Sequence, residues 1–198
     1  MSNPKYVKVD NVLYKINTDF RIALECNNIA EDTSIGDYER ALAIIYKLFG
    51  EEGLKCNNKN KLIELGLQYL SLGSIKNELK MENNEDYELD FNKCKGLIES
   101  SFKFDYNYNP YSLEYLHWYD FYNDLCNLST SEFGNCCILN RIIGILNIKS
   151  NEIKDNNQRT EIIKAQEEIK EKYCKIKYKE MTEEQKRSSE EFYKALGF

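Results

Sequence analysis

Proline is scarce in this sequence: its 198 residues include two prolines and nine glycines. Proline interrupts a helix because it has no amide hydrogen and its ring collides with the preceding turn. With so few interruptions, long helices are possible, and the composition favours a helical fold. Hydrophobic residues make up 42% of the chain and aromatic residues 13%, a content that disordered chains lack. The sequence therefore predicts a folded, helical protein.

The chain also lacks an excess of basic residues. Its formal net charge is −6, and its isoelectric point is near 5.1. Proteins that bind duplex nucleic acid usually present a basic face, which releases counterions from the phosphates. Here the basic residues alternate with acids, as they do between Lys164 and Lys179. We therefore expect no nucleic-acid partner.

Signals for export or membrane insertion are not evident. Residues 1–10 carry charges and no apolar stretch of the length that a signal peptide has. The longest apolar stretch, residues 136–148, is too short to span a bilayer and contains Asn140 and Arg141. The seven cysteines form no C-x-x-C pair, and their odd number does not suit a disulfide framework. We expect a cytoplasmic protein with free thiols and no membrane partner.

Catalytic and metal-binding motifs are missing as well. His117 is the single histidine, and it is predicted to lie mid-helix on an apolar stripe, as a packed and hydrogen-bonded core residue. A nucleophilic site would need such a base beside an exposed nucleophile. The short-spaced cysteine and histidine pairs typical of zinc sites are absent, and so are the glycine-rich phosphate-binding motifs. The sequence predicts a protein that is not an enzyme and binds no metal or cofactor.

The N-terminal residues are typical of a β-hairpin. Residues 5–9 and 12–16 alternate apolar with polar side chains around Asp10 and Asn11, which tolerate the positive φ of a tight turn. A lone hairpin is marginally stable, so we expect it to pack on helices. Thr18 or Asp19 is suited to cap the first helix.

Apolar residues after the hairpin recur at helical spacing. The predicted fold class is mainly α, a helical bundle with a small N-terminal β-hairpin and an amphipathic helical C-terminal arm. Residues 81–88 are acidic and predict a loop. The helices are expected from Ser34–Asp37 to Gly50 and Gly53, from Lys59 to Ser71, from about Asp90 through Phe102, from Leu113 to Leu128, and through Leu146 after a capping box at Ser129–Glu132.

The core is expected to centre on the last two of these helices. The first contributes His117, Trp118, Phe121 and Leu125. Arg141 is the one charge in the second, which is apolar on nearly all sides and is expected to be the most buried helix. A buried guanidinium needs a partner, so we expect Arg141 to be a core residue paired with Asp120 or Asp124.

The character of the chain changes after about residue 149. We divide it into residues 1–149, the hairpin and helical core domain, and residues 150–198, a helical extension. From Thr160 the apolar stripe is narrow, and a second capping box at Thr182–Gln185 opens a last helix. The stripe either binds a partner helix or folds back on its own domain. Its candidate partner-binding residues are Ile162, Ile169 and Tyr173.

Residues 90–166 resemble the bacteriophage gene-product-fifteen family, small proteins of tailed phages and prophages of Gram-positive bacteria. The likeness rests on three blocks along the chain, and Thr18-Asp19-Phe20-Arg21 is also similar to the start of such proteins. At Tyr119 the family pattern leads us to expect a second tryptophan. The blocks are Ile98 and Phe102 followed by Tyr106 and Tyr108; L-H-W-x-x-F at Leu116, His117, Trp118 and Phe121; and F-x-x-x-x-I-x-x-R at Phe133, Ile138 and Arg141.

This resemblance implies a role in phage tail formation. Genes of the family lie beside those of the tail tube and the tape measure, and proteins so placed usually act as tail assembly chaperones. The expectation is a chaperone that binds the tape-measure protein, and possibly the tail tube protein, in the bacterial host cytoplasm. It could also form a homo-oligomer. The alternatives are a structural tail or connector protein retained in the particle, and a small phage inhibitor of a host protein.

Overall fold

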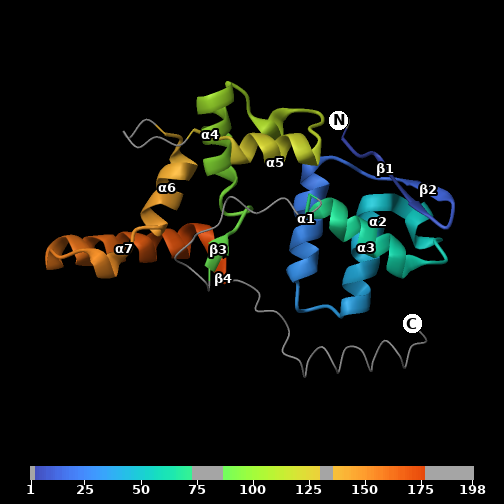
Figure 1. Ribbon diagram of the computed structural model, residues 1–198, viewed down its shortest axis with the longest axis horizontal. Helices are drawn as coiled ribbons and strands as arrows, with labels where there is room; N and C mark the ends of the chain where they lie inside the picture. Colours follow the sequence, from blue (N-terminus) through green and yellow to red (C-terminus); the bar gives the residue numbers. More distant parts are fainter. Residues whose placement is uncertain (1–2, 73–86, 130–135, 177–198) are drawn as a thin grey trace.

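A computed structural model describes residues 3–72, 87–129 and 136–176, and Figure 1 shows their arrangement. The described residues form seven α-helices, two 3₁₀ turns and two small antiparallel sheets. The predicted fold class is confirmed: the protein is mainly helical and begins with a β-hairpin. In chain order the elements are β1 (Tyr6–Val9), β2 (Val12–Lys15), α1 (Phe20–Glu31), α2 (Asp37–Leu54), α3 (Lys59–Leu70), β3 (Tyr87–Leu89), α4 (Lys95–Tyr106), η1 (Pro110–Ser112), α5 (Trp118–Cys126), α6 (Ile138–Leu146), η2 (Ser150–Glu152), α7 (Asn156–Tyr173) and β4 (Cys174–Ile176).

The hairpin and the first three helices form one end of the molecule, at the right of Figure 1. Asp10 and Asn11 have φ angles of 48° and 66°, as the predicted tight turn requires. Val9 is buried, because this face of the hairpin packs on α2 and α3. Asp19 caps α1 by accepting the amide hydrogen of Arg21, which confirms the second of the two predicted caps.

Helix α2 contains a sharp kink. Gly50 has a φ of 66°, a left-handed backbone that glycine adopts without strain. The predicted end at Gly50 is therefore correct for the first segment, and a further helical turn runs on to Leu54. The kink frees the carbonyl of Leu48, which accepts the amide hydrogen of Asn17 at 2.7 Å. The hairpin is thereby joined to α2.

Helix α5 is shorter than predicted, because it begins at Trp118 and not near Leu113. His117 is its N-cap: Nδ1 accepts the amide hydrogen of Tyr119 at 3.1 Å. The prediction of a mid-helix His117 is therefore wrong, although the side chain is buried and hydrogen-bonded. Contacts with residues 18–21 hold the residues before α5 in an extended form, and the helical periodicity of the sequence does not reveal these contacts.

The core is contiguous across α1, α4 and α5. The Phe121 ring stacks on Phe20 at 4.2 Å and on Phe102 at 5.5 Å between centroids, and all three side chains are completely buried. Trp118 lies beside Phe121, with a centroid separation of 6.0 Å. Stacked and offset aromatic rings of this kind add to the stability that buried area alone provides. The aromatic cluster joins the N-terminal helices to the middle of the chain.

The prediction for Arg141 is wrong. Its side chain is exposed, and within the described residues no carboxylate lies within ion-pair distance of it. Asp120 instead accepts a hydrogen bond from Asn3, and Asp124 accepts one from Tyr108. Helix α6 lies at an edge of the molecule and buries Leu139, Ile142 and Leu146, whereas α5, of equal length, buries four residues. It is therefore not the most buried helix.

The described part of the C-terminal extension lies on the preceding residues. Gln166 of α7 donates its amide hydrogens to the carbonyls of Ile145 and Ile148, at 2.9 and 2.8 Å. Strand β4 pairs with β3, and its Lys175 forms an ion pair with Glu31 of α1. Tyr87 and Glu88, predicted in a loop, lie in β3. The division at residue 149 stays a prediction, and the second capping box lies outside the described residues, as do residues 81–86 and most of the first box.

Candidate protein-binding surfaces

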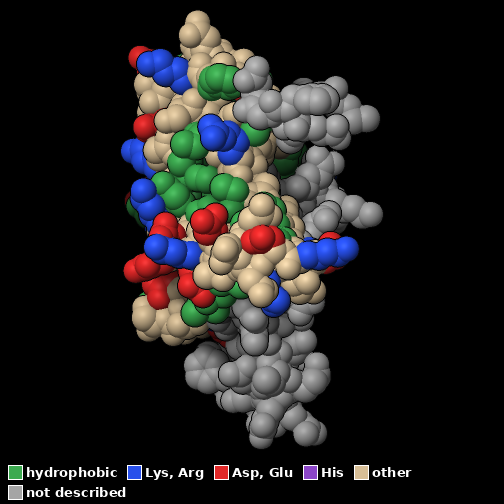
Figure 2. Space-filling view, turned by 90° about the vertical axis from the view of Figure 1, so that its left-hand side faces the viewer, with side chains coloured by type: hydrophobic (Ala, Val, Ile, Leu, Met, Phe, Trp, Pro, Cys, Tyr) green, Lys and Arg blue, Asp and Glu red, His purple; other side chains and the backbone are tan. Residues whose placement is uncertain are grey.

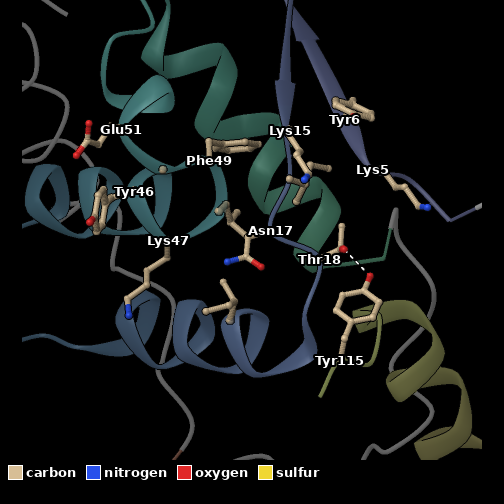
Figure 3. Close-up of a pocket in the computed structure, with 14 residues that line it drawn as sticks. Lys5, Tyr6, Lys15, Asn17, Thr18, Tyr46, Lys47, Phe49, Glu51 and Tyr115 are labelled. Atoms are coloured by element: carbon tan, nitrogen blue, oxygen red, sulfur yellow. Dashed lines mark hydrogen bonds between the residues drawn. The ribbon is translucent and has the colours of Figure 1, made fainter. Parts of the chain in front are cut away.

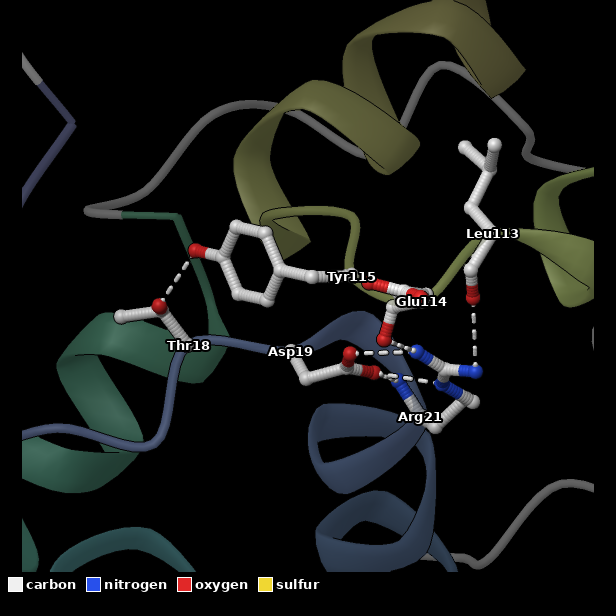
Figure 4. A network of polar contacts seen from close by, with 6 residues as sticks. All are labelled: Thr18, Asp19, Arg21, Leu113, Glu114 and Tyr115. Atoms are coloured by element: carbon white, nitrogen blue, oxygen red, sulfur yellow. Dashed lines mark hydrogen bonds and ion pairs between the residues drawn. The ribbon is translucent and has the colours of Figure 1, made fainter.

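Two segments identified in the sequence, Thr18-Asp19-Phe20-Arg21 and the L-H-W-x-x-F block, are in contact in the structure. Figure 4 shows Thr18, Asp19 and Arg21 beside the segment that precedes α5. The amide of Phe20 donates a hydrogen bond to the carbonyl of Leu116 at 3.0 Å, and the amide of Trp118 donates one to the carbonyl of Thr18 at 2.8 Å. Residues almost a hundred positions apart thus form a short antiparallel bridge.

Arg21 holds this bridge in place. Its guanidinium makes a two-point contact with Asp19, at 2.8 and 2.6 Å, and donates to the carbonyls of Leu113 and Glu114 at 3.1 and 2.8 Å. The hydrogen bond to Asp19 raises the pKa of Arg21 above its ordinary value. A planar fork of donors suits such simultaneous recognition of a carboxylate and two carbonyls. This network is structural, because every partner belongs to the chain itself.

His117 and Trp118 tie two further segments to this bridge. The Nε2 atom of His117 donates to the carbonyl of Pro4 at 3.3 Å, since Nδ1 already serves as the acceptor at the helix cap. The indole of Trp118 donates to the carbonyl of Leu70 at 3.1 Å, at the end of α3. The L-H-W-x-x-F block is therefore a docking element for the N-terminal helices, and neither side chain is available to a substrate.

A groove of about 990 Å³ opens beside the bridge, between the hairpin, α1 and α2. Figure 3 shows lysine and tyrosine side chains around it, with Asn17 near its centre. Tyr115 closes one side through a 2.6 Å hydrogen bond between its hydroxyl and that of Thr18. Amide, phenol and ammonium groups of this kind can bind a polypeptide. The labelled groove residues are Lys5, Tyr6, Lys15, Asn17, Thr18, Tyr46, Lys47, Phe49, Glu51 and Tyr115.

The buried thiols near these surfaces are unsuited to nucleophilic chemistry. Burial raises the pKa of both Cys26 and Cys94 to about 12, so that both stay protonated at neutral pH. Across residues 3–72, 87–129 and 136–176, no three His, Cys, Asp or Glu side chains gather in a way that could hold a metal ion. None of the helices in the described part of the chain is both long and apolar enough to cross a bilayer.

A second surface lies over α6 and α7, on the face at the left of Figure 1. Figure 2 shows hydrophobic side chains gathered at the centre of this face, with basic and acidic side chains around them. Among the exposed apolar residues of the protein are Phe104 of α4, Ile138 of α6 and Ile148, which follows α6, with exposed fractions of 65%, 44% and 38%. The exposed Arg141 lies on the same helix as Ile138.

The predicted site residues are divided between the core and these surfaces. His117, Trp118, Phe121 and Leu125 are buried, whereas Arg141 is exposed. Of the candidate partner-binding residues, Ile169 and Tyr173 pack against the chain's own core, and Ile162 is half-buried. Of the three half-buried residues, Ile162 is therefore the one that does not pack against this described core.

Sequence reasoning missed the groove and the Arg21 network. Both depend on contacts between segments far apart in the chain, so that no local pattern marks them. Thr18-Asp19-Phe20-Arg21 carries a partial signal, because it is similar to the start of the family's proteins, but this likeness assigns no role to the arginine. The exposed tyrosines at positions 6, 46 and 115 had no signal, because tyrosine is frequent throughout the sequence.

Comparison with known proteins agrees with the resemblance seen in the sequence. The family model described as bacteriophage Gp15 protein matches residues 2–171, which include the hairpin, the bridge and nearly all of α7. No curated protein and no solved structure matches the chain. Because the family model matches far more than half of the sequence, the chain belongs to the bacteriophage Gp15 protein family.

Proposed function

We propose that this protein is a phage tail assembly chaperone that binds the tape-measure protein in the cytoplasm of the bacterial host. The observation that carries the proposal is membership of the phage family over residues 2–171. The role follows from the position expected for genes of this family, beside those of the tail tube and the tape measure. The protein acts by binding and not by catalysis.

The surfaces of the protein support this proposal. A chaperone for a long helical protein must cover apolar stripes that would otherwise aggregate. Phe104 and Ile138 offer exposed apolar side chains for that purpose, and the groove between the hairpin and α2 offers tyrosines and lysines. The net charge of −6 favours the solubility of a complex with an aggregation-prone partner.

Co-expression with the tape-measure protein of the same phage tests the proposal. We expect the two proteins to co-purify and the tape measure to be more soluble than when it is expressed alone. We also expect mass spectrometry of purified mature particles to detect no copy of this protein. Its presence at stoichiometric levels in the particle would favour the structural tail or connector role instead. Failure to co-purify with the tape measure would contradict the proposal.

A further inference from the structure

The outward side of α6 carries a regular apolar stripe. Ile138 and Ile145 are separated by two helical turns and lie on the same side, with Arg141 between them. Ile148 follows just after the helix and is 38% exposed. The adjoining side carries the buried Leu139, Ile142 and Leu146, and Ile145 itself is half-buried. From Ile138 to Ile148 the stripe is roughly 15 Å long, which is enough for about three turns of another helix.

Helix α7 forms a second wall for this stripe. Its Gln166 holds the carbonyls at the end of α6, and Ile162 lies one turn before Gln166 on the same side of α7. Figure 1 shows α7 crossing this end of α6 and extending beyond it. Ile162 is half-buried and lies one turn from this contact, so we assign it to the apolar corner where α6 and α7 meet.

Arg141 gives this corner its chemical specificity. The guanidinium is exposed between two isoleucines and has no carboxylate partner within the described residues. A charge in the middle of an apolar interface is costly if it is buried alone, and an arginine in such a place favours a partner carboxylate that it can bind at two points. The surface thus selects an apolar helix that carries one acidic residue within its stripe.

We propose that the α6–α7 face, made of Ile138, Arg141, Ile145, Ile148 and Ile162, binds an amphipathic helix of the partner protein, with an aspartate or glutamate of that helix against Arg141. This inference rests on the proposed function, because the tape measure is the partner expected to supply such a helix. The α6–α7 face thus takes the place of Ile169 and Tyr173 as the expected binding surface, because those two residues pack on the chain's own core.

A second copy of the chain is a poor occupant of this face. A two-fold axis at the middle of the stripe would set Arg141 close to Arg141 of the other copy, whether the helices ran parallel or antiparallel. Two guanidinium groups at the centre of an apolar interface repel each other and gain no hydrogen bond. Charge complementarity therefore favours a different, acidic helix.

Binding of the tape measure by variants tests the inference. We expect Arg141→Glu and the double variant Ile138→Ser with Ile148→Ser each to raise the Kd by about tenfold or more, and Arg141→Lys to raise it less. Leu67→Ser is the matched control, because Leu67 of α3 is 45% exposed and Ile138 is 44% exposed. We expect this control to bind as the wild type does. Circular dichroism and thermal melts establish that each variant is folded.

The outcomes separate this inference from the proposed function. If the wild type binds the tape measure and the face variants bind equally well, the α6–α7 face is not the binding surface, and the chaperone proposal stands. If the wild type does not bind, both fail. A dimer of the purified protein that Ile138→Ser with Ile148→Ser dissociates would make a second copy the occupant and overturn the inference. If changing the acidic residue of the partner helix to lysine restores binding to the Arg141→Glu variant, the predicted contact between that residue and Arg141 is established.

Discussion

Trp118 shows why one side chain can matter to several segments at once. It is 2% exposed, it packs beside Phe121 and Tyr122 of its own helix, and its indole hydrogen satisfies the carbonyl of Leu70. A carbonyl at a helix end needs such a donor when it is shielded from water. The residue thus contributes both apolar burial and a hydrogen bond between α5 and α3.

Two substitutions separate these contributions. We expect Trp118→Ala to lower the free energy of unfolding by roughly 3–5 kcal/mol, as the loss of a buried aromatic side chain does. Trp118→Phe should cost less, about 1–3 kcal/mol, largely through the unpaired Leu70 carbonyl. Urea denaturation followed by circular dichroism measures both values. Equal losses would contradict a separate role for the indole hydrogen.

The arginine-to-lysine substitution can be compared at two positions, the hydrogen-bonded Arg21 and the exposed Arg141. Arg21→Lys loses the two-point contact with Asp19 and at least one carbonyl contact, so we expect a loss of about 1 kcal/mol in the free energy of unfolding. Arg141→Lys, at an exposed position, should change stability by less than about 0.5 kcal/mol. Similar losses from urea denaturation in both variants would show that the Arg21 network does not stabilise the fold.

Among the elements, α2 depends most clearly on one backbone conformation. The kink at Gly50 turns the last helical turn away from the preceding turns of α2. It also frees the Leu48 carbonyl to accept the amide hydrogen of Asn17. The lining of the groove includes Gly50 and its neighbours Phe49 and Glu51. The kink therefore positions both the hairpin and the groove.

Matched glycine substitutions test this role. Gly50→Ala forces a side chain into the left-handed region at φ 66°, and we expect it to destabilise the protein by about 1–2 kcal/mol. Gly96→Ala lies within α4, where an added Cβ meets no atom within 4 Å, and should stabilise the protein by roughly 0.5–1 kcal/mol. Thermal melts compare the two variants. A stabilising Gly50→Ala would mean that the kink is not required.

At the scale of the whole molecule, contacts between distant segments join the two ends of the described chain. Phe20, Phe102 and Phe121 join α1, α4 and α5 in one stack, and Lys175 of β4 pairs with Glu31 of α1. Several cysteines are buried within this common core, including Cys26, Cys94 and Cys174. Their ionisation is therefore linked to global unfolding.

This linkage predicts a loss of stability in alkali. The pKa of Cys26 is about 12 in the folded protein and 9.0 in its ordinary environment, and Cys94 behaves in the same way. Because the folded-state pKa is raised, the contribution to stability is complete below about pH 9 and is lost as the pH rises toward about 12, by up to about 1.4 kcal/mol per pH unit for each thiol. Urea denaturation at increasing pH measures this slope. Cys26→Ala should make it shallower, and an unchanged slope would contradict the assignment.

Local chemistry in the sequence determined the elements and the family. Alternating residues around Asp10-Asn11 specified the hairpin, Asp19 and Gly50 marked helix ends, and Trp118 and Phe121 were recognisable as core because helical periodicity depends on neighbouring residues alone. Tertiary structure decided where α5 begins and which side of α6 meets solvent. The segment before His117 is extended because Arg21 and Phe20 bind its carbonyls, and Arg141 is exposed because α4 packs against another side of its helix. Those partners lie far away in the sequence, so no local pattern could specify them.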